Sequence, residues 1–431
     1  MIDNYTSLFD VALPVTFYKL KTRNLTTIIL LILALLTVVG IFYYDYTIRT
    51  NSSTEIKEDD IESIKQLYTN DQREEQPIQS PDESDQASDR SPDKLPQVEP
   101  KPDTNISQPE PIQSGDQLKY TAWIPSWGHT AGVASLQKQP EIFGSISPVW
   151  YSPTPDGSLD IKFPSGYKTF LQFCKDNDIR VIPSIAMFDA EVLTQILNSN
   201  TNFSRHINQI IDQVAINDFD GIDIDYEMIY LSDKDRFLTF VDELSTRLQK
   251  DNKILSITIL AQWGDNVIYP SLKETRAVQE LELIGKLADE VRIMTYDYTP
   301  NSSREPGPIA PIDWMENVLK YTVTKIPSEK IWLGTHLYGY EWISTGGVSA
   351  TTFSDLSQLR SIEDFQVTHN YTYNEGVANY TCATDLKCTL FFQDQKGIEA
   401  RRSLAEKYQI AGLAFWRLGD EADLLTPLLS D

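Results

Sequence analysis

The sequence predicts an α/β protein whose folded part is a (β/α)8 barrel, and three observations favour this fold. Eight short apolar runs recur over the about 310 residues that begin at Lys119, each with the length of a buried strand. Amphipathic segments separate most of these runs, so strands and helices alternate along the chain. One barrel with modest insertions accounts for this length. A doubly wound open sheet is the alternative, but no G-x-G-x-x-G motif follows the first run.

The expected strands and helices follow one another in a regular order. Helical periodicity is clearest in DRFLTFVDELSTRLQK from Asp235 and in PIDWMENVLKYTVTK from Pro311. The eight strand candidates are YTAWI from Tyr120, SISPVW from Ser145, RVIPSI from Arg180, GIDIDY from Gly221, LSITIL from Leu255, VRIMTY from Val291, IWLGTHL from Ile331 and GLAFW from Gly412.

One segment, from about residue 345 to residue 395, interrupts the alternation between the seventh strand and the last helix. It contains VTHNYTYNEGVANYTCATDLKCTLFFQD, which is typical of β-hairpins, so we expect a small α+β insertion here. Cys382 and Cys388 flank a short turn and are candidates for a disulfide, which an extracytoplasmic location would permit. Two free thiols are the alternative. Cys174 is expected to be a buried helix residue without chemistry.

The N-terminal part predicts a single-pass membrane anchor. Residues 25–44 read LTTIILLILALLTVVGIFYY, an uncharged run long enough to span a lipid bilayer. Lys19, Lys21 and Arg23 precede it, so the positive-inside rule places residues 1–24 in the cytoplasm and everything after the span outside the cell membrane. A cleaved signal peptide is the alternative, but its apolar region is usually shorter and followed by small residues.

Composition distinguishes a linker from the barrel and excludes several functions. Residues 45–118 form the expected linker, and residues 51–118 hold 17 Asp and Glu against 6 Lys and Arg, 8 prolines, and neither Trp nor Phe. Such a segment is expected to stay disordered. The net charge of −25 disfavours nucleic acid as a partner. Three cysteines and four histidines without a Cys/His cluster make a zinc site improbable, so no metal and no cofactor are expected.

The fourth strand candidate carries the chemistry. Asp223, Asp225 and Glu227 occur at every second position, so their side chains share one face of a strand that is otherwise apolar. Carboxylates held this close cannot all ionise cheaply, and one of them binds a proton more tightly. The outermost, Glu227, could then act as a general acid, oriented by the inner two. A solvated edge strand and a calcium-binding loop are the alternatives.

Three motifs in this part of the chain resemble glycoside hydrolase family 18, the chitinase-like barrels. DGIDIDYE, residues 220–227, matches the D-G-x-D-x-D-x-E signature, MTYD follows from Met294, and LAFWRLGDE follows from Leu413. The stretch around THLYGYEW is similar to the branch of bacterial spore-germination peptidoglycan hydrolases. The resemblance covers residues 119–431, and it implies hydrolysis of a glycan that contains N-acetylglucosamine.

The resemblance also implies roles for individual residues. Glu227 would protonate the glycosidic oxygen while the 2-acetamido carbonyl of the substrate attacks the anomeric carbon, an exception to the two-carboxylate mechanism. Asp225 would hold the acetamido nitrogen, Asp223 would share a proton with Asp225, and Tyr296 would donate to the acetamido oxygen. Trp416 would form the floor under the sugar, lined by Met294 and Asp297. Further substrate contacts, for which simple packing is the alternative, are expected at Trp123, Trp150, Tyr226, Tyr338 and Trp342.

Two departures from the family pattern concern the shape of the site. SIAM, residues 184–187, stands where S-x-G-G is common, and its larger side chains could narrow the site. His336 could contact substrate or bond a backbone carbonyl. We therefore expect a membrane-tethered hydrolase of β-linked N-acetylglucosamine polymers, with peptidoglycan ahead of chitin. A non-catalytic lectin of the same fold, or a scaffold whose partner binds the acidic linker, is the alternative.

Overall fold

A computed structural model describes residues 118–429 of the chain, with the exception of residues 266, 268, 270, 384, 385 and 422. The expected cytoplasmic segment, transmembrane helix and linker lie almost wholly before residue 118 and therefore outside the described residues. Within the described part, none of the helices combines the length and the apolar character needed to cross a bilayer.

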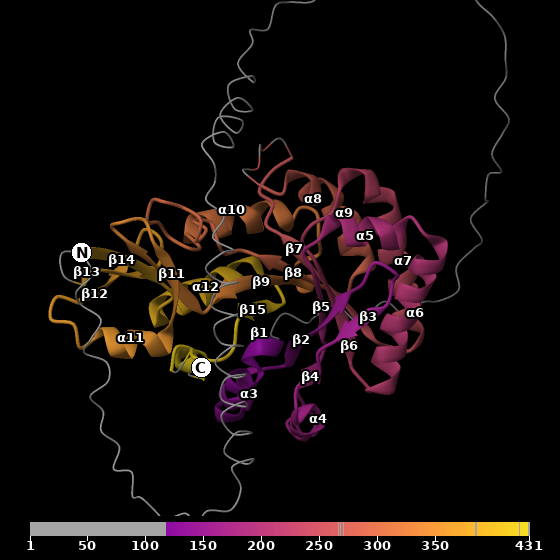
Figure 1. The fold of residues 1–431 in the computed structure, drawn as a ribbon, viewed down its shortest axis with the longest axis horizontal. Coiled ribbons are helices and arrows are strands. Elements are labelled where there is room, and N and C mark those ends of the chain that lie inside the picture. The colour runs from indigo at the N-terminus through magenta and orange to yellow at the C-terminus, as the bar shows by residue number, and fades with distance from the viewer. Residues whose placement is uncertain are drawn as a thin grey trace, which may run out of the picture. The chain divides into compact units, whose positions relative to one another are not determined.

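Eight parallel strands close into a barrel at the centre of the described part (Figure 1). They are hydrogen-bonded in the order β1-β15-β9-β8-β7-β6-β5-β2, and pairing between β1 and β2 closes the ring. Each of the eight predicted strands is present, which confirms the barrel. Their bounds are β1 (Lys119–Pro125), β2 (Ser145–Pro153), β5 (Ser184–Met187), β6 (Gly221–Tyr226), β7 (Ile254–Leu260), β8 (Glu290–Met294), β9 (Ile331–His336) and β15 (Gly412–Trp416). Two short strands, β3 (Leu159–Ile161) and β4 (Arg180–Val181), also pair with β2.

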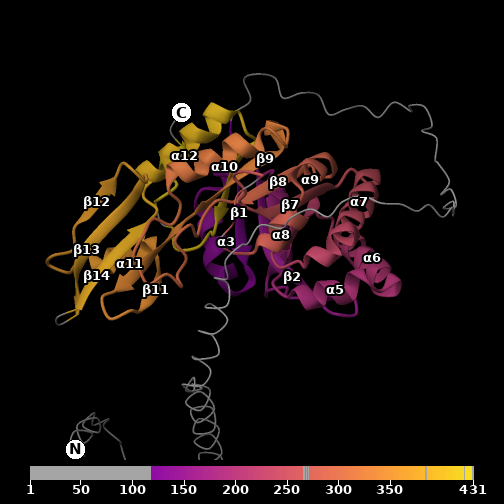
Figure 2. The same cartoon turned by 90° about the horizontal axis from the view of Figure 1, so that it is seen from above.

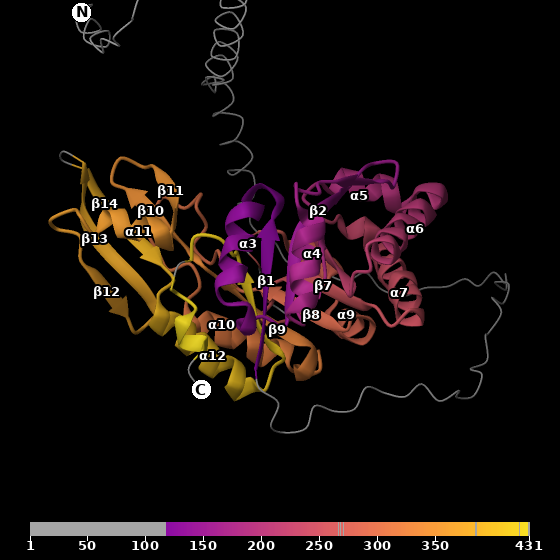
Figure 3. The same cartoon turned by 90° about the horizontal axis from the view of Figure 1, so that it is seen from below.

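Helices cover the outside of the barrel, and Figure 3 shows α5, α6 and α7 side by side on it. Several begin where a short polar side chain caps a backbone N–H: Asp189 caps α5, Ser199 caps α6 and Asp394 caps α12. The helices are α3 (His129–Lys138), α4 (Tyr167–Asp176), α5 (Ala190–Leu197), α6 (Asn200–Ile216), α7 (Lys234–Lys250), α8 (Lys273–Val278), α9 (Leu281–Leu287), α10 (Ile312–Thr322) and α12 (Gln395–Tyr408).

The main hydrophobic core lies between the strands and these helices. On β6, Ile222 and Ile224 point outward into it, alongside Phe240 and Leu244 of α7. Burying one such side chain contributes about 1.5–3 kcal/mol. Because side chains alternate along a strand, this outward packing turns the residues between them toward the barrel interior.

The insertion is a five-stranded antiparallel sheet with one helix, seen beside the barrel in Figure 2. It begins at Tyr338, earlier than the predicted boundary near residue 345, because β10 follows β9 after Leu337 alone. The strand order is β11-β10-β14-β13-β12. The bounds are β10 (Tyr338–Ile343), β11 (Val348–Thr352), α11 (Phe353–Leu359), β12 (Val367–Asn370), β13 (Glu375–Ala383) and β14 (Leu386–Phe392).

A buried carboxylate joins the insertion to the loop that follows β8. Glu375 of β13 accepts hydrogen bonds from the backbone N–H groups of Ile309 and Ala310, at 2.9 and 2.5 Å. Arg401 of α12 lies 3.4 Å from the same carboxylate and also donates to the Ala310 carbonyl at 2.7 Å. Losing one partner of such a buried pair is strongly destabilising. These contacts therefore fix the far end of a loop whose beginning carries Tyr296.

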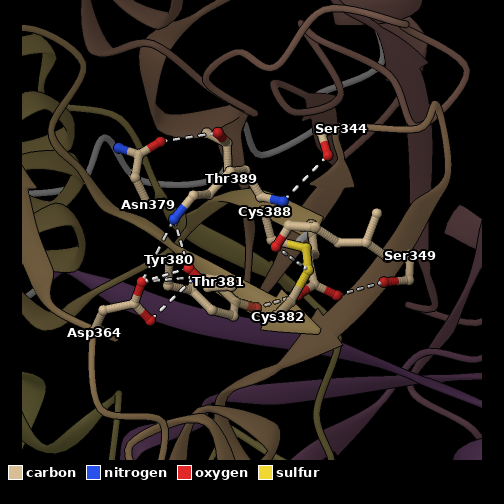
Figure 4. The surroundings of a disulfide bond; sticks show 12 residues. Ser344, Ser349, Asp364, Asn379, Tyr380, Thr381, Cys382, Cys388 and Thr389 are labelled. Carbon is tan, nitrogen blue, oxygen red and sulfur yellow. Dashed lines mark hydrogen bonds and ion pairs between the residues drawn. A yellow bond between two sulfur atoms is a disulfide. The ribbon is translucent and has the colours of Figure 1, made fainter. Parts of the chain in front are cut away.

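A disulfide between Cys382 and Cys388 links β13 to β14, with the two Cα atoms 5.7 Å apart (Figure 4). Beside it, Glu341 of β10 accepts hydrogen bonds from Tyr380 and Ser349. The disulfide lies at the tip of the insertion sheet, where it closes the β13–β14 turn. Cys174 is free and buried in α4.

Candidate active site

Strand β6 presents its acids at the C-terminal end of the barrel, where the active sites of such barrels are built. Asp223 and Asp225 are buried and point inward, and Glu227 follows the last residue of the strand. The Glu227 N–H donates to the Met187 carbonyl at 3.0 Å, so the backbone pairing with the neighbouring strand β5 continues to Glu227. The side chain of Glu227 is half-buried, and the three acids thus form a row from the barrel interior toward solvent.

Asp223 is held by hydroxyl groups from the two neighbouring strands. Ser184 of β5 donates to it at 2.6 Å, Ser256 of β7 at 2.7 Å and Thr258 of β7 at 3.1 Å. Three such donors stabilise the ionised form of a buried carboxylate. We expected the inner acids to hydrogen-bond Glu227, but Asp223 is instead held by this set. Ser184 is the first residue of the SIAM segment, so this segment retains the serine of the S-x-G-G pattern.

Arg292 is a buried cation that the sequence reasoning missed. Its Nη1 lies 3.8 Å from Asp223 Oδ2, and its Nη2 donates to Glu290 at 3.0 Å. Nη1 also donates to the Ser147 hydroxyl. A charge with no exposed surface needs such partners. An arginine inside the apolar strand VRIMTY was the available signal, because a charged residue rarely lies in a barrel interior without a partner.

Asp225 lies in a different environment from Asp223. Its Oδ1 is buried and makes no hydrogen bond to any residue that the structure describes. Burial first, and then the charges of Glu227 and Asp223, raise the pKa of Asp225 well above its ordinary value, whereas Arg292 opposes this shift. Asp225 therefore binds a proton more readily than an ordinary aspartate does. Its surroundings differ from those of Asp223, which accepts hydrogen bonds from three hydroxyl groups.

Burial and the nearby charge of Asp297 raise the pKa of Glu227 from 4.5 to about 7. A carboxyl group that titrates near neutral pH is suited to donate a proton. The half-buried position lets this proton reach a group bound outside the barrel.

Tyr296 follows β8 and belongs to the same group of side chains. Burial, followed by the charges of Asp225 and Glu227, raises its pKa well above the ordinary value, so its hydroxyl remains a donor. Gly334 of β9 leaves room for the ring, since a Cβ there would lie 3.1 Å from Tyr296 Cε1 and 2.3 Å from the Ile293 carbonyl oxygen. The close approach of these two strands thus requires glycine.

Asp297 and Tyr338 are brought together, as are Trp416 and Trp123. Asp297 accepts hydrogen bonds from the hydroxyls of Tyr338 and Tyr340, the second at 2.9 Å. Tyr338 thereby orients Asp297. Trp416 lies at the end of β15 and is partly exposed, with its ring centroid 6.1 Å from that of Trp123. Met294 ends β8 and is also partly exposed.

Trp123 is only 1% exposed, and its indole N–H donates to Asp223 at 3.1 Å. The expectation that it stacks on substrate is therefore corrected, because it supports a carboxylate from inside the barrel. Trp150 and Trp342 are also buried by their neighbours, so the expectation that they stack on substrate is corrected for both.

Tyr226 is the clearest correction. It alternates with Asp225 and so points outward, where it bonds His206 and stacks on Phe240 with 1% of its surface exposed. Contact with substrate is excluded by this placement. His336 is also fully buried, edge-on to Tyr338, and it hydrogen-bonds none of the described residues. Neither role expected for His336 is observed.

Four other aromatic residues lie exposed after strands of the barrel. Trp127 follows β1 with 73% of its surface exposed, Phe188 follows β5 with 60%, Tyr230 lies in the loop after β6 with 45%, and Tyr298 lies in the loop after β8 with 53%. They stand at the same end of the barrel as Glu227. Trp123, Trp150 and Trp342 were expected at or just after strand ends, whereas these other aromatic residues are the ones exposed to a ligand.

Comparisons with known proteins identify the family of this chain. The family described as glycosyl hydrolases family 18 matches residues 149–421. The sporulation-specific glycosylase YdhD of Bacillus subtilis is 28% identical over 235 residues, 54% of each chain. The cortical fragment-lytic enzyme of Bacillus subtilis is 25% identical over 254 residues, 57% of each chain. The chain thus spans about half the length of these relatives.

A solved structure shows the same fold. The spore cortex-lytic enzyme SleL of Bacillus megaterium superposes with a TM-score of 0.65 at 21% identity, over 72% of this chain and 73% of that chain. At such low identity the likeness concerns the fold, and the chemistry depends on the residues described above.

Proposed function

This chain belongs to glycosyl hydrolases family 18, and from that premise we propose that it hydrolyses β-linked N-acetylglucosamine polymers, peptidoglycan ahead of chitin, with retention of configuration. The observation that carries the proposal is the row of Asp223, Asp225 and Glu227, in which burial raises the pKa of both Asp225 and Glu227. The peptidoglycan preference is supported by the cortical fragment-lytic relatives.

Glu227 acts as the general acid. Its proton passes to the glycosidic oxygen as the bond between that oxygen and the anomeric carbon breaks. The 2-acetamido carbonyl oxygen of the same sugar forms a bond to the anomeric carbon and gives an oxazolinium ion. Glu227, now a carboxylate, takes a proton from the water that opens this ring. Two inversions at one carbon leave its configuration retained.

Asp225 and Tyr296 hold the acetamido group in the reactive orientation. Asp225 accepts from the amide N–H as positive charge develops, and the Tyr296 hydroxyl donates to the carbonyl oxygen. Asp223, fixed by its hydroxyl donors and by Arg292, contributes to the raised pKa of Asp225. Trp416 forms the apolar surface beneath the ring. The reaction needs no cofactor.

The expected membrane anchor bears on where the enzyme is located. We propose that residues 25–44 hold the chain in the cell membrane and that residues 45–118 tether an extracytoplasmic barrel, as their composition favours. Treatment of intact cells with protease should release the barrel if this orientation is right, whereas protection of the barrel until lysis would contradict it.

Product analysis tests the proposed activity. The purified barrel should release reducing N-acetylglucosamine ends from peptidoglycan strands, and more slowly from chitin oligomers, as identified by mass spectrometry. The first-formed anomer should be β, because configuration is retained. Release of the α-anomer would contradict the mechanism, and absence of products from both polymers would contradict the function.

Hydrolysis should weaken as pH rises through neutrality. Glu227 must be protonated to act, and its pKa of about 7 in the folded protein means that the active form is lost above that pH. We expect kcat/KM to fall about 10-fold for each pH unit above this value, with an apparent pKa shared among Glu227, Asp225 and Asp297. Initial rates on a soluble, uncharged chitin oligomer measure this, and a rate that does not change between pH 6 and pH 9 would contradict it.

A further inference from the structure

Arg417 and Trp127 form a pair at the C-terminal end of the barrel that the proposed mechanism does not use. Arg417 follows Trp416 directly, at the end of β15, and Trp127 follows β1. Because β1 and β15 are neighbours in the sheet, the two residues stand side by side. Arg417 directly follows Trp416, the proposed floor of the reacting sugar, so the pair is a candidate for contact with an adjoining sugar.

The contact between them leaves one face of Trp127 open, whereas the side chain of Arg417 keeps 16% of its surface exposed. The Arg417 guanidinium carbon lies 4.3 Å from the centroid of the Trp127 ring, a cation–π contact on one ring face. Trp127 is otherwise mostly exposed, so its surface remains available for stacking. A sugar ring on the open face of this indole would lie across the ring from the guanidinium, so a substituent of that sugar would reach Arg417 past the edge of the indole.

Arg417 is held only weakly by its own chain. Its Nη2 lies 4.0 Å from Asp420 Oδ2, and its Nη1 lies 3.5 and 3.4 Å from the carbonyl oxygens of Leu418 and Gly419. Arg401, by contrast, donates to backbone carbonyls at 2.7 and 2.8 Å. Long contacts of this kind are weak hydrogen bonds, so a carboxylate ligand could replace them with a bidentate pair.

The charges of this end of the barrel explain why such a cation matters. Asp223, Asp225, Glu227 and Asp297 gather here, and the whole chain carries a net charge of −25. A neutral glycan meets no repulsion, whereas a glycan with a carboxylate on alternate sugars does. A cation at the adjoining position offsets that repulsion.

We propose that Arg417 and Trp127 form a substrate-binding subsite for an amino sugar that carries a carboxylate on its 3-O substituent, as muramic acid does. Trp127 stacks on the ring, and Arg417 binds the carboxylate. This inference rests on the proposed function and deepens it, because it names the feature that separates peptidoglycan from chitin. The carboxylate is either that of a free lactyl group or that of the first acidic residue of a peptide on it.

Three tetrasaccharides test the subsite. One alternates N-acetylglucosamine with N-acetylmuramic acid and has free lactyl carboxylates, the second carries an alanyl-glutamate dipeptide on each lactyl group, and the third is uncharged chitotetraose. Arg417→Gln should lower kcat/KM for a carboxylate substrate by about 10-fold or more, the loss of a charge-assisted hydrogen bond. It should change kcat/KM for chitotetraose less than about 2-fold. Trp127→Ala should weaken the binding of all three substrates.

The comparison between substrates decides the outcome. If kcat/KM of Arg417→Gln falls only for the lactyl substrate, Arg417 binds the free lactyl carboxylate. If it falls only for the dipeptide substrate, Arg417 binds the peptide carboxylate. An equal loss on all three, or no loss on any, overturns the subsite. Arg247→Gln on α7, whose guanidinium bonds Asn208, is the matched control and should leave all three unchanged.

Two further measurements keep failure of the subsite distinct from failure of the proposed function. If wild-type protein cleaves chitotetraose but Arg417→Gln is not selective, only the subsite is wrong. If wild-type protein cleaves none of the three, the proposed function is wrong as well. If Arg417→Gln lowers the melting temperature, Arg417→Lys is used in its place. In addition, calorimetry measures the binding of the lactyl tetrasaccharide and of chitotetraose to the inactive Glu227→Gln protein. Equal affinity for the two ligands in that experiment also overturns the subsite.

Discussion

Glu227→Gln is expected to abolish hydrolysis while leaving the fold and glycan binding intact. Glutamine keeps the shape and the hydrogen-bonding capacity of the side chain but cannot give up a proton to the glycosidic oxygen. General acid catalysis contributes about 100- to 10 000-fold to a rate, so kcat should fall by that amount. Steady-state rates on peptidoglycan strands and on chitin oligomers measure the loss.

The stability of the same variant separates catalysis from folding. The pKa of Glu227 is raised from 4.5 to about 7 in the folded state, so its ionisation opposes folding, and stability falls as pH rises between these two values. Glutamine does not ionise. The melting temperature at pH 8 should therefore be equal to or above that of the wild type.

Glu305→Gln is the matched control, because Glu305 is exposed on the loop after β8 and the chemical change is the same. It should retain full activity. If Glu227→Gln kept more than a few percent of the wild-type rate, Glu227 would not be the acid. If Glu305→Gln lost as much, the effect would not be specific.

Asp225→Asn is expected to lower turnover by about 100- to 1000-fold, the range found when a group that stabilises transition-state charge is removed. Asparagine presents an amide where the acetamido N–H needs an acceptor that can carry negative charge. The protonated state of Asp225 depends on burial and on Glu227 and Asp223, so the substitution also removes the coupling between these groups.

Binding of a thiazoline analogue of the oxazolinium ion distinguishes this role from a structural one. The Asp225→Asn protein should bind the analogue about 10-fold or more weakly than the wild type does, because one charge-assisted hydrogen bond is lost. Asp160→Asn, at an exposed residue of β3, should bind it normally. Unchanged affinity in Asp225→Asn would remove the substrate-assisted part of the mechanism and leave the general acid untouched.

The fold was predictable because its signals are local. Each of the eight strands is an apolar run, and amphipathic segments separate most of them, so the barrel follows from the order of elements along the chain. The insertion boundary was misplaced because β10 continues from β9 without a turn signal. YGYEWI, the sequence of β10, contains no Gly/Pro turn motif that would mark the change from the last residues of β9 to a second sheet.

The binding surface was less predictable, because a tryptophan inside a strand looks the same in sequence whether it lines a site or fills a core. Trp123 donates to Asp223, whereas Tyr226 points away from Asp223, although Tyr226 lies between Asp225 and Glu227 in the sequence. Exposure decides between these roles, and it depends on strands far apart in the chain. Trp127 and Tyr298, a few residues beyond strand ends, were overlooked for that reason.

The sequence alone determined which residues could carry out the chemistry: the alternation in DGIDIDYE places three carboxyl groups on one face, whatever surrounds them. Only the tertiary structure decided how their protons are shared. Ser184, Ser256 and Arg292 come from three different strands, and together they stabilise the charge on Asp223 while Asp225 is left without a donor at Oδ1. Proton affinity in a buried site is set by neighbours within a few ångströms, and the closing of the barrel is what makes these residues neighbours.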